Sequence, residues 1–232
     1  MLPWLQTNED FPPVTMALSE PSGLLAAGGD LSAAWLIAAY SRGIFPWFNA
    51  DQPILWWAPE PRMVLFPDEL HVPKSLARVI RKRHYEIRVN TVFEQVMQGC
   101  SQPRTGQDGT WISPQMIAAY TELHRLGLAH SIETWINGEL VGGLYGVALG
   151  RVFYGESMFA RIADASKIAF VHLVRQLRRW QFRIIDCQMN TAHLARFGAR
   201  EIPRADFMQS LAEGVYAPGI ALPWQFEDDL IE

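Results

Sequence analysis

The spacing of hydrophobic and polar residues in the second half of the chain predicts a meander of three strands. Residues 128–135 and 139–148 are strand-like, and Asn137-Gly138 between them is the dipeptide favoured in type I′ hairpin turns. A third strand-like run, residues 151–158, follows closely. Short connections between successive strands predict antiparallel pairing.

Beyond the meander the period changes to that of a helix. Apolar residues from Ile168 to Leu177 largely follow helical spacing, and Asp164 or Ser166 is the expected cap. The next run, Ile184-Ile185-Asp186-Cys187-Gln188-Met189, begins as a buried strand and ends in a carboxylate, a thiol and an amide. These polar groups suit a site better than a core. We expect a short helix from about 191, a strand at 200–202 and a helix at 205–213.

The first half of the chain predicts shorter elements separated by Pro and Gly. We expect helices at 31–42 (capped by Asp30), 74–82, after Asn90 as cap to 97, and from Ser113-Pro114 to about 127, with strands near 62–66 and 85–89. The order of elements predicts an α+β fold. Pro59 and Pro61 suggest a boundary between a small domain, residues 1–61, and a larger one, residues 62–232.

Composition indicates a folded, enzyme-sized protein. Of its 232 residues, 49% are hydrophobic and 19% are charged, which argues against disorder. The longest uncharged run has thirteen residues, fewer than the ~20 that a membrane-spanning helix needs. The N-terminus has no basic region typical of a secretory signal, and the chain has two cysteines, Cys100 and Cys187. We therefore expect a soluble protein of the reducing cytoplasm.

A basic segment stands out against the net charge of −4. Residues 71–88 contain six Lys or Arg residues and one acid. Lys74, Arg78, Arg81 and Lys82 fall at helical spacing on one face, where they could follow nucleic-acid phosphates or simply form a solvated surface.

Familiar catalytic motifs are absent, and two carboxylates are the main candidates for chemistry. The chain has no Walker A, dinucleotide-binding, HExxH or GxSxG motif, and its histidines are expected in packing or at the surface. Glu156 and Asp186 each lie near a predicted strand end. If these strands are neighbours, the carboxylates line one cleft beside Met158 and Trp111 and can handle an amine; otherwise they are structural. Cys187 is a weaker candidate because no His lies at a recognisable spacing.

Several motifs together resemble one enzyme family. They are Gly28-Gly29-Asp30-Leu31-Ser32, Tyr40-Ser41-Arg42-Gly43-Ile44-Phe45-Pro46-Trp47-Phe48, Trp56-Trp57-Ala58-Pro59, Gly109-Thr110-Trp111-Ile112, Leu140-Val141-Gly142-Gly143-Leu144-Tyr145-Gly146-Val147, Gly155-Glu156-Ser157-Met158-Phe159 and Ile185-Asp186-Cys187-Gln188. In this order and spacing, over residues 20–208, the chain resembles the leucyl/phenylalanyl-tRNA–protein transferases.

The resemblance implies a small N-terminal α+β domain followed by a GNAT-like acyltransferase domain with a mixed, largely antiparallel sheet and flanking helices. It implies a cytoplasmic, monomeric enzyme with no cofactor or metal. The implied reaction transfers Leu, Phe and less readily Met from aminoacyl-tRNA to proteins or peptides beginning with Arg or Lys, which marks them for degradation by the N-end rule.

The resemblance also implies roles for individual residues. Asp186 would act as base or stabilise the ammonium formed on attack, unless a ribose hydroxyl of the tRNA carries the proton. Gln188 would orient the reacting groups and donate to the oxyanion, and Glu156 would arrange this centre or bind the cationic acceptor. The aminoacyl pocket would comprise Leu144, Phe153, Met158, Leu173, Leu177 and Ile185, with Trp47 and Trp111 flanking the terminal adenosine. Lys74, Arg78, Arg81, Lys82 and Arg83 would hold tRNA phosphates.

Two other functions fit parts of the sequence. The strand–helix–strand run over residues 151–189 also resembles an acetyltransferase core of the GNAT type, so a coenzyme A-dependent acetyltransferase of protein N-termini is one alternative. The loop at residues 160–165 lacks the glycines that cradle the coenzyme A pyrophosphate and contains an acid, which disfavours it. The other alternative is a tRNA-binding module without catalysis, which leaves the placement of Glu156 and Asp186 unexplained.

Overall fold

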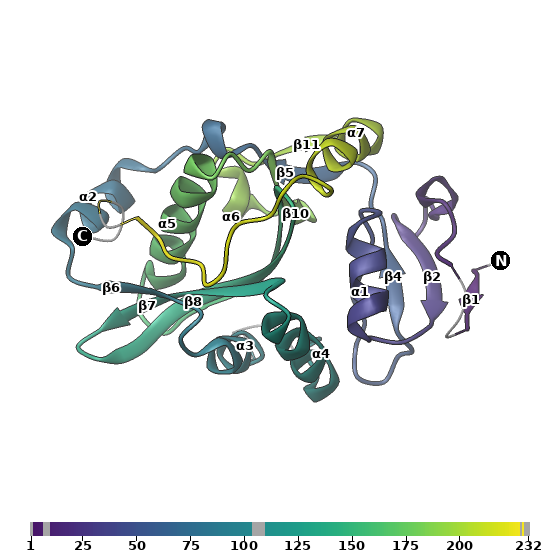
Figure 1. Cartoon of the computed structure of the whole chain (residues 1–232), viewed down its shortest axis with the longest axis horizontal. Helices are drawn as coiled ribbons and strands as arrows, with labels where there is room; N and C mark the ends of the chain where they lie inside the picture. The colour runs from purple at the N-terminus through teal and green to yellow at the C-terminus, as the bar shows by residue number, and fades with distance from the viewer. Residues whose placement is uncertain (1, 7–9, 104–109, 228, 230–232) are drawn as a thin grey trace.

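The chain folds into two β-sheets in a computed structural model that describes residues 2–6, 10–103, 110–227 and 229. Gly109, the first residue of the motif Gly109-Thr110-Trp111-Ile112, lies outside this part of the chain, as do residues 104–108 before it. Figure 1 shows the two sheets side by side along the longest axis, with the N-terminal sheet at one end.

The N-terminal sheet has four strands within the described residues, in the order β1-β2-β4-β3. They are β1 (Trp4–Leu5), β2 (Leu24–Gly28), β3 (Phe45–Pro46) and β4 (Leu55–Trp57). Helix α1 (Ala33–Tyr40) lies beside them (Figure 1). Its cap is Ser32, whose side chain accepts a bond from the Trp35 amide, and not Asp30 as expected. Asp30 Oδ1 instead accepts from the Ser32 amide at 2.7 Å, because it lies too far from the first helical turn.

The larger sheet has seven strands within the described residues, in the order β11-β5-β10-β9-β8-β7-β6. They are β5 (Arg62–Leu65), β6 (Glu86–Val89), β7 (Ala129–Ile136), β8 (Glu139–Leu149), β9 (Val152–Ala160), β10 (Ile184–Gln188) and β11 (Arg200–Ile202). The antiparallel meander β7-β8-β9 is confirmed, with Asn137 and Gly138 both at positive φ as a type I′ turn requires. β10 is parallel to β9, which makes the sheet mixed and confirms the α+β class.

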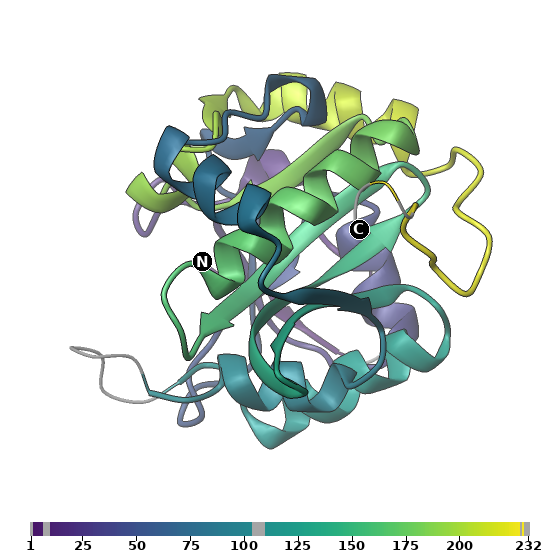
Figure 2. The ribbon, with the colours of Figure 1, turned by 90° about the vertical axis from the view of Figure 1, so that its left-hand side faces the viewer.

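Helices cover both faces of the larger sheet (Figure 2). The helices of this region are α2 (Lys74–Lys82), α3 (Phe93–Cys100), α4 (Pro114–Arg125), α5 (Ala165–Arg179), α6 (Ala192–Ala195) and α7 (Arg204–Gly214). α3 and α4 lie on one face, and α5 crosses the other with α2 beside it (Figure 2). α5 connects the parallel strands β9 and β10, so the expected strand–helix–strand unit is present.

The predicted cap at Asn90 was also wrong, whereas the one at Asp164 is confirmed in position. Asn90 has a positive φ of 59° and accepts a bond from the Ser131 amide across the sheet, while α3 begins later and its preceding amides, including that of Val92, bond to Glu133. Asp164 is the residue at the cap position of α5, but its side chain accepts a bond from Lys167 Nζ at 2.7 Å and caps no backbone amide. In both cases a longer-range or ionic partner replaces the local one.

The predicted boundary after Pro61 falls between the two sheets and stays a prediction. The two parts are packed together: Tyr40 at the end of α1 contacts Tyr154 of β9, with ring centroids 4.9 Å apart, and the Tyr154 hydroxyl donates to the Tyr40 carbonyl at 2.8 Å. One cluster of buried apolar residues includes members of both sheets. A site between the parts can therefore be fixed in position.

The C-terminal segment crosses the larger sheet on the side of α5 (Figure 1), and its Trp224 covers His130. Trp224 stacks on the His130 ring, with centroids 3.5 Å apart and planes 6° apart, and also contacts Trp180. The backbone amide of Glu227 donates to Gln176 Oε1 of α5 at 2.9 Å. His130 is 1% exposed, as expected for a packing residue.

Acid should destabilise the fold through His130. Burial, with a smaller contribution from His124, lowers the pKa of His130 from 6.5 to about 3. The folded state keeps this ring neutral while the unfolded chain protonates it, so the stabilisation is present above pH 6.5 and is lost as the pH falls towards 3. In urea unfolding, lowering the pH from 7.5 to 5.0 should cost the natural protein about 2 kcal/mol more than the His130→Gln variant. Equal losses in the two proteins would contradict this.

Candidate active site

The site forms where two neighbouring parallel strands separate. β9 and β10 pair through Ile184 with Val152, Ile185 with Phe153 and Asp186 with Tyr154, and their pairing ends there. Each strand then has a bulge, since the register shifts around Glu156 in β9 and around Cys187 in β10. Bulges bend a strand and redirect its side chains. β9 and β10 are therefore neighbours, which was the condition for Glu156 and Asp186 to share one cleft.

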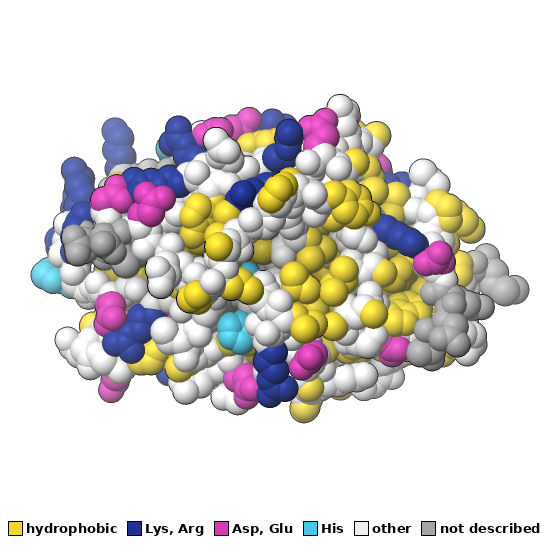
Figure 3. Space-filling model, viewed as in Figure 1, with side chains coloured by type: hydrophobic (Ala, Val, Ile, Leu, Met, Phe, Trp, Pro, Cys, Tyr) yellow, Lys and Arg dark blue, Asp and Glu magenta, His cyan; other side chains and the backbone are white. Residues whose placement is uncertain are grey.

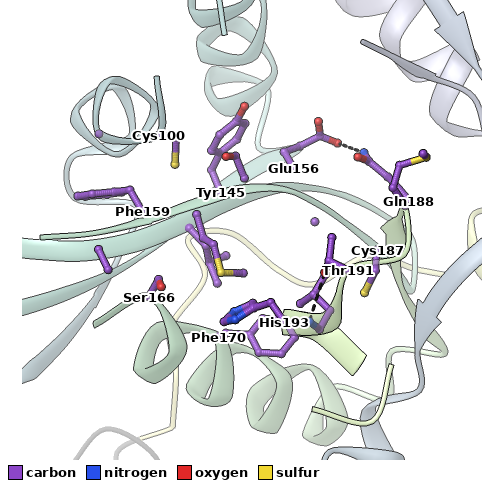
Figure 4. A pocket seen from close by; sticks show the side chains of 18 of the residues that line it. Cys100, Tyr145, Glu156, Phe159, Ser166, Phe170, Cys187, Gln188, Thr191 and His193 are labelled. Carbon is purple, nitrogen blue, oxygen red and sulfur yellow. Dashed lines mark hydrogen bonds between the residues drawn. The ribbon is translucent and has the colours of Figure 1, made fainter. Parts of the chain in front are cut away.

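A cavity of about 840 Å³ opens at this separation. Its lining includes nine of the eleven predicted catalytic and substrate-binding residues: Trp47, Trp111, Leu144, Phe153, Glu156, Met158, Leu173, Ile185 and Gln188. Figure 4 shows Tyr145 and Glu156 on one side of the sheet and Phe170 and His193 on the other. The cavity thus has an apolar part against α5 and a polar part at Glu156.

Asp186 and Leu177 are not among the residues that line the cavity in the described structure. Leu177 is a residue of α5, and its side chain is fully buried in the core. Asp186 is also fully buried, and its two carboxylate oxygens accept from Arg62 Nε at 2.8 Å and Arg62 Nη2 at 2.6 Å. Asp186 Oδ1 accepts a third bond from the backbone amide of Gln188 at 2.8 Å. The carboxylate is therefore directed away from the cavity and towards a cation.

Glu156 is at the centre of a hydrogen-bond network. Its Oε1 accepts from the Tyr40 hydroxyl at 2.7 Å and from Gln188 Nε2 at 3.0 Å, and its Oε2 accepts from the Tyr120 hydroxyl at 3.2 Å. The two tyrosine hydroxyls also bond to one another. Burial raises the pKa of both phenols well above 10, so they remain protonated donors. The bond from Gln188 to Glu156 bridges the separated strands (Figure 4).

The pKa of Glu156 is raised to about 7. Desolvation by burial is the largest cause, and the negative charge of Asp186 adds to it, while the bonds from Tyr40, Tyr120 and Gln188 act in the opposite direction. A carboxylate with a pKa near neutrality can accept a proton and release it again at physiological pH. The geometry therefore favours Glu156 over Asp186 as the group that exchanges protons with a bound molecule.

Sequence reasoning missed several residues of this site. Tyr40 and Tyr120 lie 116 and 36 residues from Glu156, and Arg62 lies 124 residues from Asp186, so no local pattern connects them. A usable signal existed for Ser166 and Phe170, which share one face of α5 with Leu173 at spacings of four and three residues. Cys187 lines the cavity, but burial raises the pKa of its thiol, which disfavours it as a nucleophile.

The five predicted phosphate-binding residues, Lys74, Arg78, Arg81, Lys82 and Arg83, are all exposed on or just after α2. Lys and Arg side chains gather at the end of the molecule where α2 lies (Figure 3). A second cavity of about 500 Å³ is lined by four of the five, without Lys82, together with Arg175 of α5. Arg175 was not expected from the sequence, because it comes from a different helix.

The part of the chain that the structure describes contains neither a membrane-spanning helix nor a cluster of metal-ligand side chains. No helix there combines the length and apolar character needed to cross a bilayer. No group of three His, Cys, Asp or Glu side chains there is arranged to hold a metal ion.

Comparison with known proteins assigns similarity over the whole chain. The family model described as leucyl/phenylalanyl-tRNA protein transferase matches residues 64–212, and the model of its N-terminal domain matches residues 29–60. The chain is 61% identical to the leucyl/phenylalanyl-tRNA–protein transferase of Nitrosospira multiformis over 100% of both proteins. It is 59% identical to that of Chromobacterium violaceum over 97% of each. A solved GCN5-related N-acetyltransferase from Kribbella flavida is a distant likeness, with TM-score 0.33 and 10% identity over 73% of this chain and 60% of the other.

Titration of Glu156 should report the network directly. In a protein with ¹³C-labelled glutamate carboxyls, we expect the Glu156 resonance to titrate with a midpoint near pH 7. Tyr40→Phe removes a hydrogen bond that favours the charged form and should move the midpoint upward. Tyr85→Phe is the matched control, because the Tyr85 hydroxyl bonds to His172 and not to Glu156. A midpoint near 4.5 in the natural protein, or no response to Tyr40→Phe, would contradict the assignment.

Proposed function

The chain belongs to the leucyl/phenylalanyl-tRNA–protein transferase family, and we propose that the cavity between β9 and β10 is where it transfers an aminoacyl group from tRNA to a protein N-terminus. The observation that carries this proposal is the pairing of an apolar pocket with a carboxylate of near-neutral pKa in a single cavity. An aminoacyl side chain needs the first, and an attacking amine needs the second.

The reaction is the aminolysis of an ester. The α-amino group of the acceptor attacks the ester carbonyl, a carbon–nitrogen bond forms, and the bond to the ribose oxygen breaks. Because an α-ammonium group has a pKa near ~8, it must lose a proton before attack. That first proton goes to solvent. On attack the nitrogen loses a second proton, which we assign to Glu156, and Glu156 passes it to the leaving ribose oxygen. The donor ester is already activated, so positioning of the two substrates can supply several kcal/mol of the acceleration, roughly up to 7–11.

Gln188 is proposed to serve the developing oxyanion. One hydrogen of its amide nitrogen is directed to Glu156, and a primary amide has a second hydrogen to donate. A donor held in place before the reaction stabilises charge that appears in the transition state. Asp186, which the family resemblance suggested as base, already accepts three bonds beside a permanent cation. We therefore propose a supporting role for Asp186.

The apolar part of the cavity is proposed to hold the side chain of the transferred amino acid. Leu144, Phe153, Met158, Leu173 and Ile185 line it, and Phe170 adds a sixth apolar wall. An unbranched-at-Cβ side chain such as Leu, Phe or Met fits between such walls, and burying it contributes about 1.5–3 kcal/mol to binding. Trp47, which is 41% exposed, and Trp111 lie at the cavity and are proposed to flank the terminal adenosine.

Further proposals follow the family. The acceptors are proteins or peptides with N-terminal Arg or Lys, whose cationic groups suit a cavity containing Glu156, and the product is marked for degradation by the N-end rule. The enzyme acts in the cytoplasm as a monomer. Lys74, Arg78, Arg81, Lys82 and Arg83 hold tRNA phosphates, and phosphate contacts of this kind are independent of tRNA sequence.

Transfer of label from tRNA to a peptide tests the assignment. The protein is incubated with radiolabelled Leu-tRNA and a peptide beginning with Arg, with labelled acetyl-CoA as a parallel donor. We expect transfer from tRNA with a rate that rises through about pH 7, because Glu156 must be deprotonated. Glu156→Gln should lower kcat by about 100-fold or more and remove this dependence.

The outcomes separate the alternatives. Transfer from acetyl-CoA alone would indicate an acetyltransferase, and tight tRNA binding without transfer in any condition would indicate a binding module. If Glu156→Gln transfers at the natural rate, the proton passes elsewhere, and the ribose hydroxyl of the tRNA becomes the favoured acceptor. Tyr85→Phe is the matched control and should leave kcat unchanged, because Tyr85 bonds to His172 and does not line the cavity.

Neutralising the basic surface should weaken tRNA binding and its salt dependence. Arg78→Ala and Arg81→Ala should each reduce the slope of log K against log salt concentration by about 1, because each removes a phosphate contact. The change should be the same for tRNA of different sequence. Arg125→Ala removes an exposed arginine from α4 and is the matched control. An unchanged slope in the α2 variants would remove this surface from the binding site.

A further inference from the structure

Arg62 is a buried arginine at the first position of β5, behind the wall of the cavity. It is 1% exposed. The guanidinium lies over the ring of Phe45 from β3 at 4.9 Å and over the ring of Phe207 from α7 at 4.7 Å. Both of these rings are themselves buried. Two aromatic faces and a bidentate carboxylate fix the plane of the guanidinium, so this side chain has a single orientation.

Arg62 is connected to the cavity through Asp186. It donates two bonds to that carboxylate, and Asp186 Oδ1 accepts a third from the backbone amide of Gln188. This amide lies at the bulge of β10, where Cys187 is the extra residue. The Gln188 backbone has a φ of 61°, in the left-handed region that residues with a side chain adopt rarely. Such a conformation persists when surrounding contacts hold it.

The conformation of Gln188 decides where its side chain points. At this φ its amide reaches Glu156 Oε1 at 3.0 Å across the separated strands. In a regular strand the side chains of neighbouring residues alternate between the two faces of the sheet, so loss of the bulge would redirect Gln188. A displacement of about 1 Å in a reacting group can cost roughly 100-fold in rate.

We propose that Arg62 is a positioning residue for the transfer reaction. Through Asp186 it holds the backbone bulge at Gln188, and it thereby aims the side-chain amide of Gln188 at Glu156 and at the ester carbonyl. This inference rests on the proposed function. It gives the buried Asp186 a task, because Asp186 acts through its hydrogen bond to the backbone amide of Gln188. It also gives the N-terminal sheet and α7 a part in catalysis, because Phe45 and Phe207 hold the guanidinium.

A double-mutant cycle on the full-length enzyme tests the proposal. Arg62→Met should lower kcat for transfer from Leu-tRNA, up to about 100-fold, with KM for tRNA and peptide little changed. Gln188→Gly tolerates positive φ but has no side chain to aim. In that background Arg62→Met should lower kcat no further, because the group that Arg62 positions is gone. Residues that act as one unit are non-additive in this way.

Other outcomes would overturn it. If Arg62→Met lowers kcat by the same factor with and without the Gln188 side chain, its effect is a general one on the fold. If it leaves kcat unchanged in the natural background, Arg62 has no part in positioning. Absence of transfer by the natural enzyme would instead contradict the proposed function itself. Arg204→Met is the matched control, since this partly buried arginine bonds to the Ala58 carbonyl and to Glu60 but not to β10.

A milder substitution covers failure of Arg62→Met to fold. Arg62→Lys keeps the charge but cannot make the two parallel bonds to Asp186. Arg62→Lys should lower kcat by a smaller factor than Arg62→Met does. In the Gln188→Gly background, Arg62→Lys should again leave kcat unchanged. The same two outcomes, an equal loss in both backgrounds or no loss in either, would overturn the proposal.

Discussion

The separation of β9 from β10 beyond Tyr154 and Asp186 is the constraint on which the site depends. Two paired strands leave no space between them, and two separated strands expose backbone groups that must find partners. Here bulges at Glu156 and Cys187 turn the strands apart, and the bond from Gln188 to Glu156 bridges the opening. A single irregularity of the sheet thus provides both the cavity and its polar groups.

The same irregularity explains why the chain needs both of its sheets. Glu156 leaves its place in a regular strand and loses water, which raises its pKa to about 7. The hydroxyls that compensate in part come from Tyr40 of α1 and Tyr120 of α4, and the Arg62 guanidinium opposite is held by Phe45 of β3. Without the N-terminal part of the chain, the site would lack the Tyr40 hydroxyl and the Phe45 ring, which are two of these four groups. The N-terminal sheet therefore completes the site as well as packing against it.

Local patterns in the sequence predicted the elements well, and non-local contacts account for the failures. The turn at Asn137-Gly138 and the helix of residues 74–82 depend on residues next to one another, and both are present. The cap expected at Asn90 failed because its side chain bonds across the sheet to Ser131. Likewise, Asp186 was expected to line one cleft with Glu156 if their strands were neighbours, yet it is fully buried although the strands are adjacent. Its partner Arg62, 124 residues away, makes full burial possible.

Helix α5 connects the two ends of the proposed substrate. Ser166, Phe170 and Leu173 face the cavity, and Arg175 faces the basic pocket beside α2. From Ser166 to Arg175 the helix rises by about 14 Å, and a helix is stiff over that length. If the two cavities take the aminoacyl side chain and a tRNA phosphate, as proposed, one rigid element sets the distance between these two groups. In the proposed function, α5 therefore couples recognition of the ester at one end to recognition of the nucleic acid at the other.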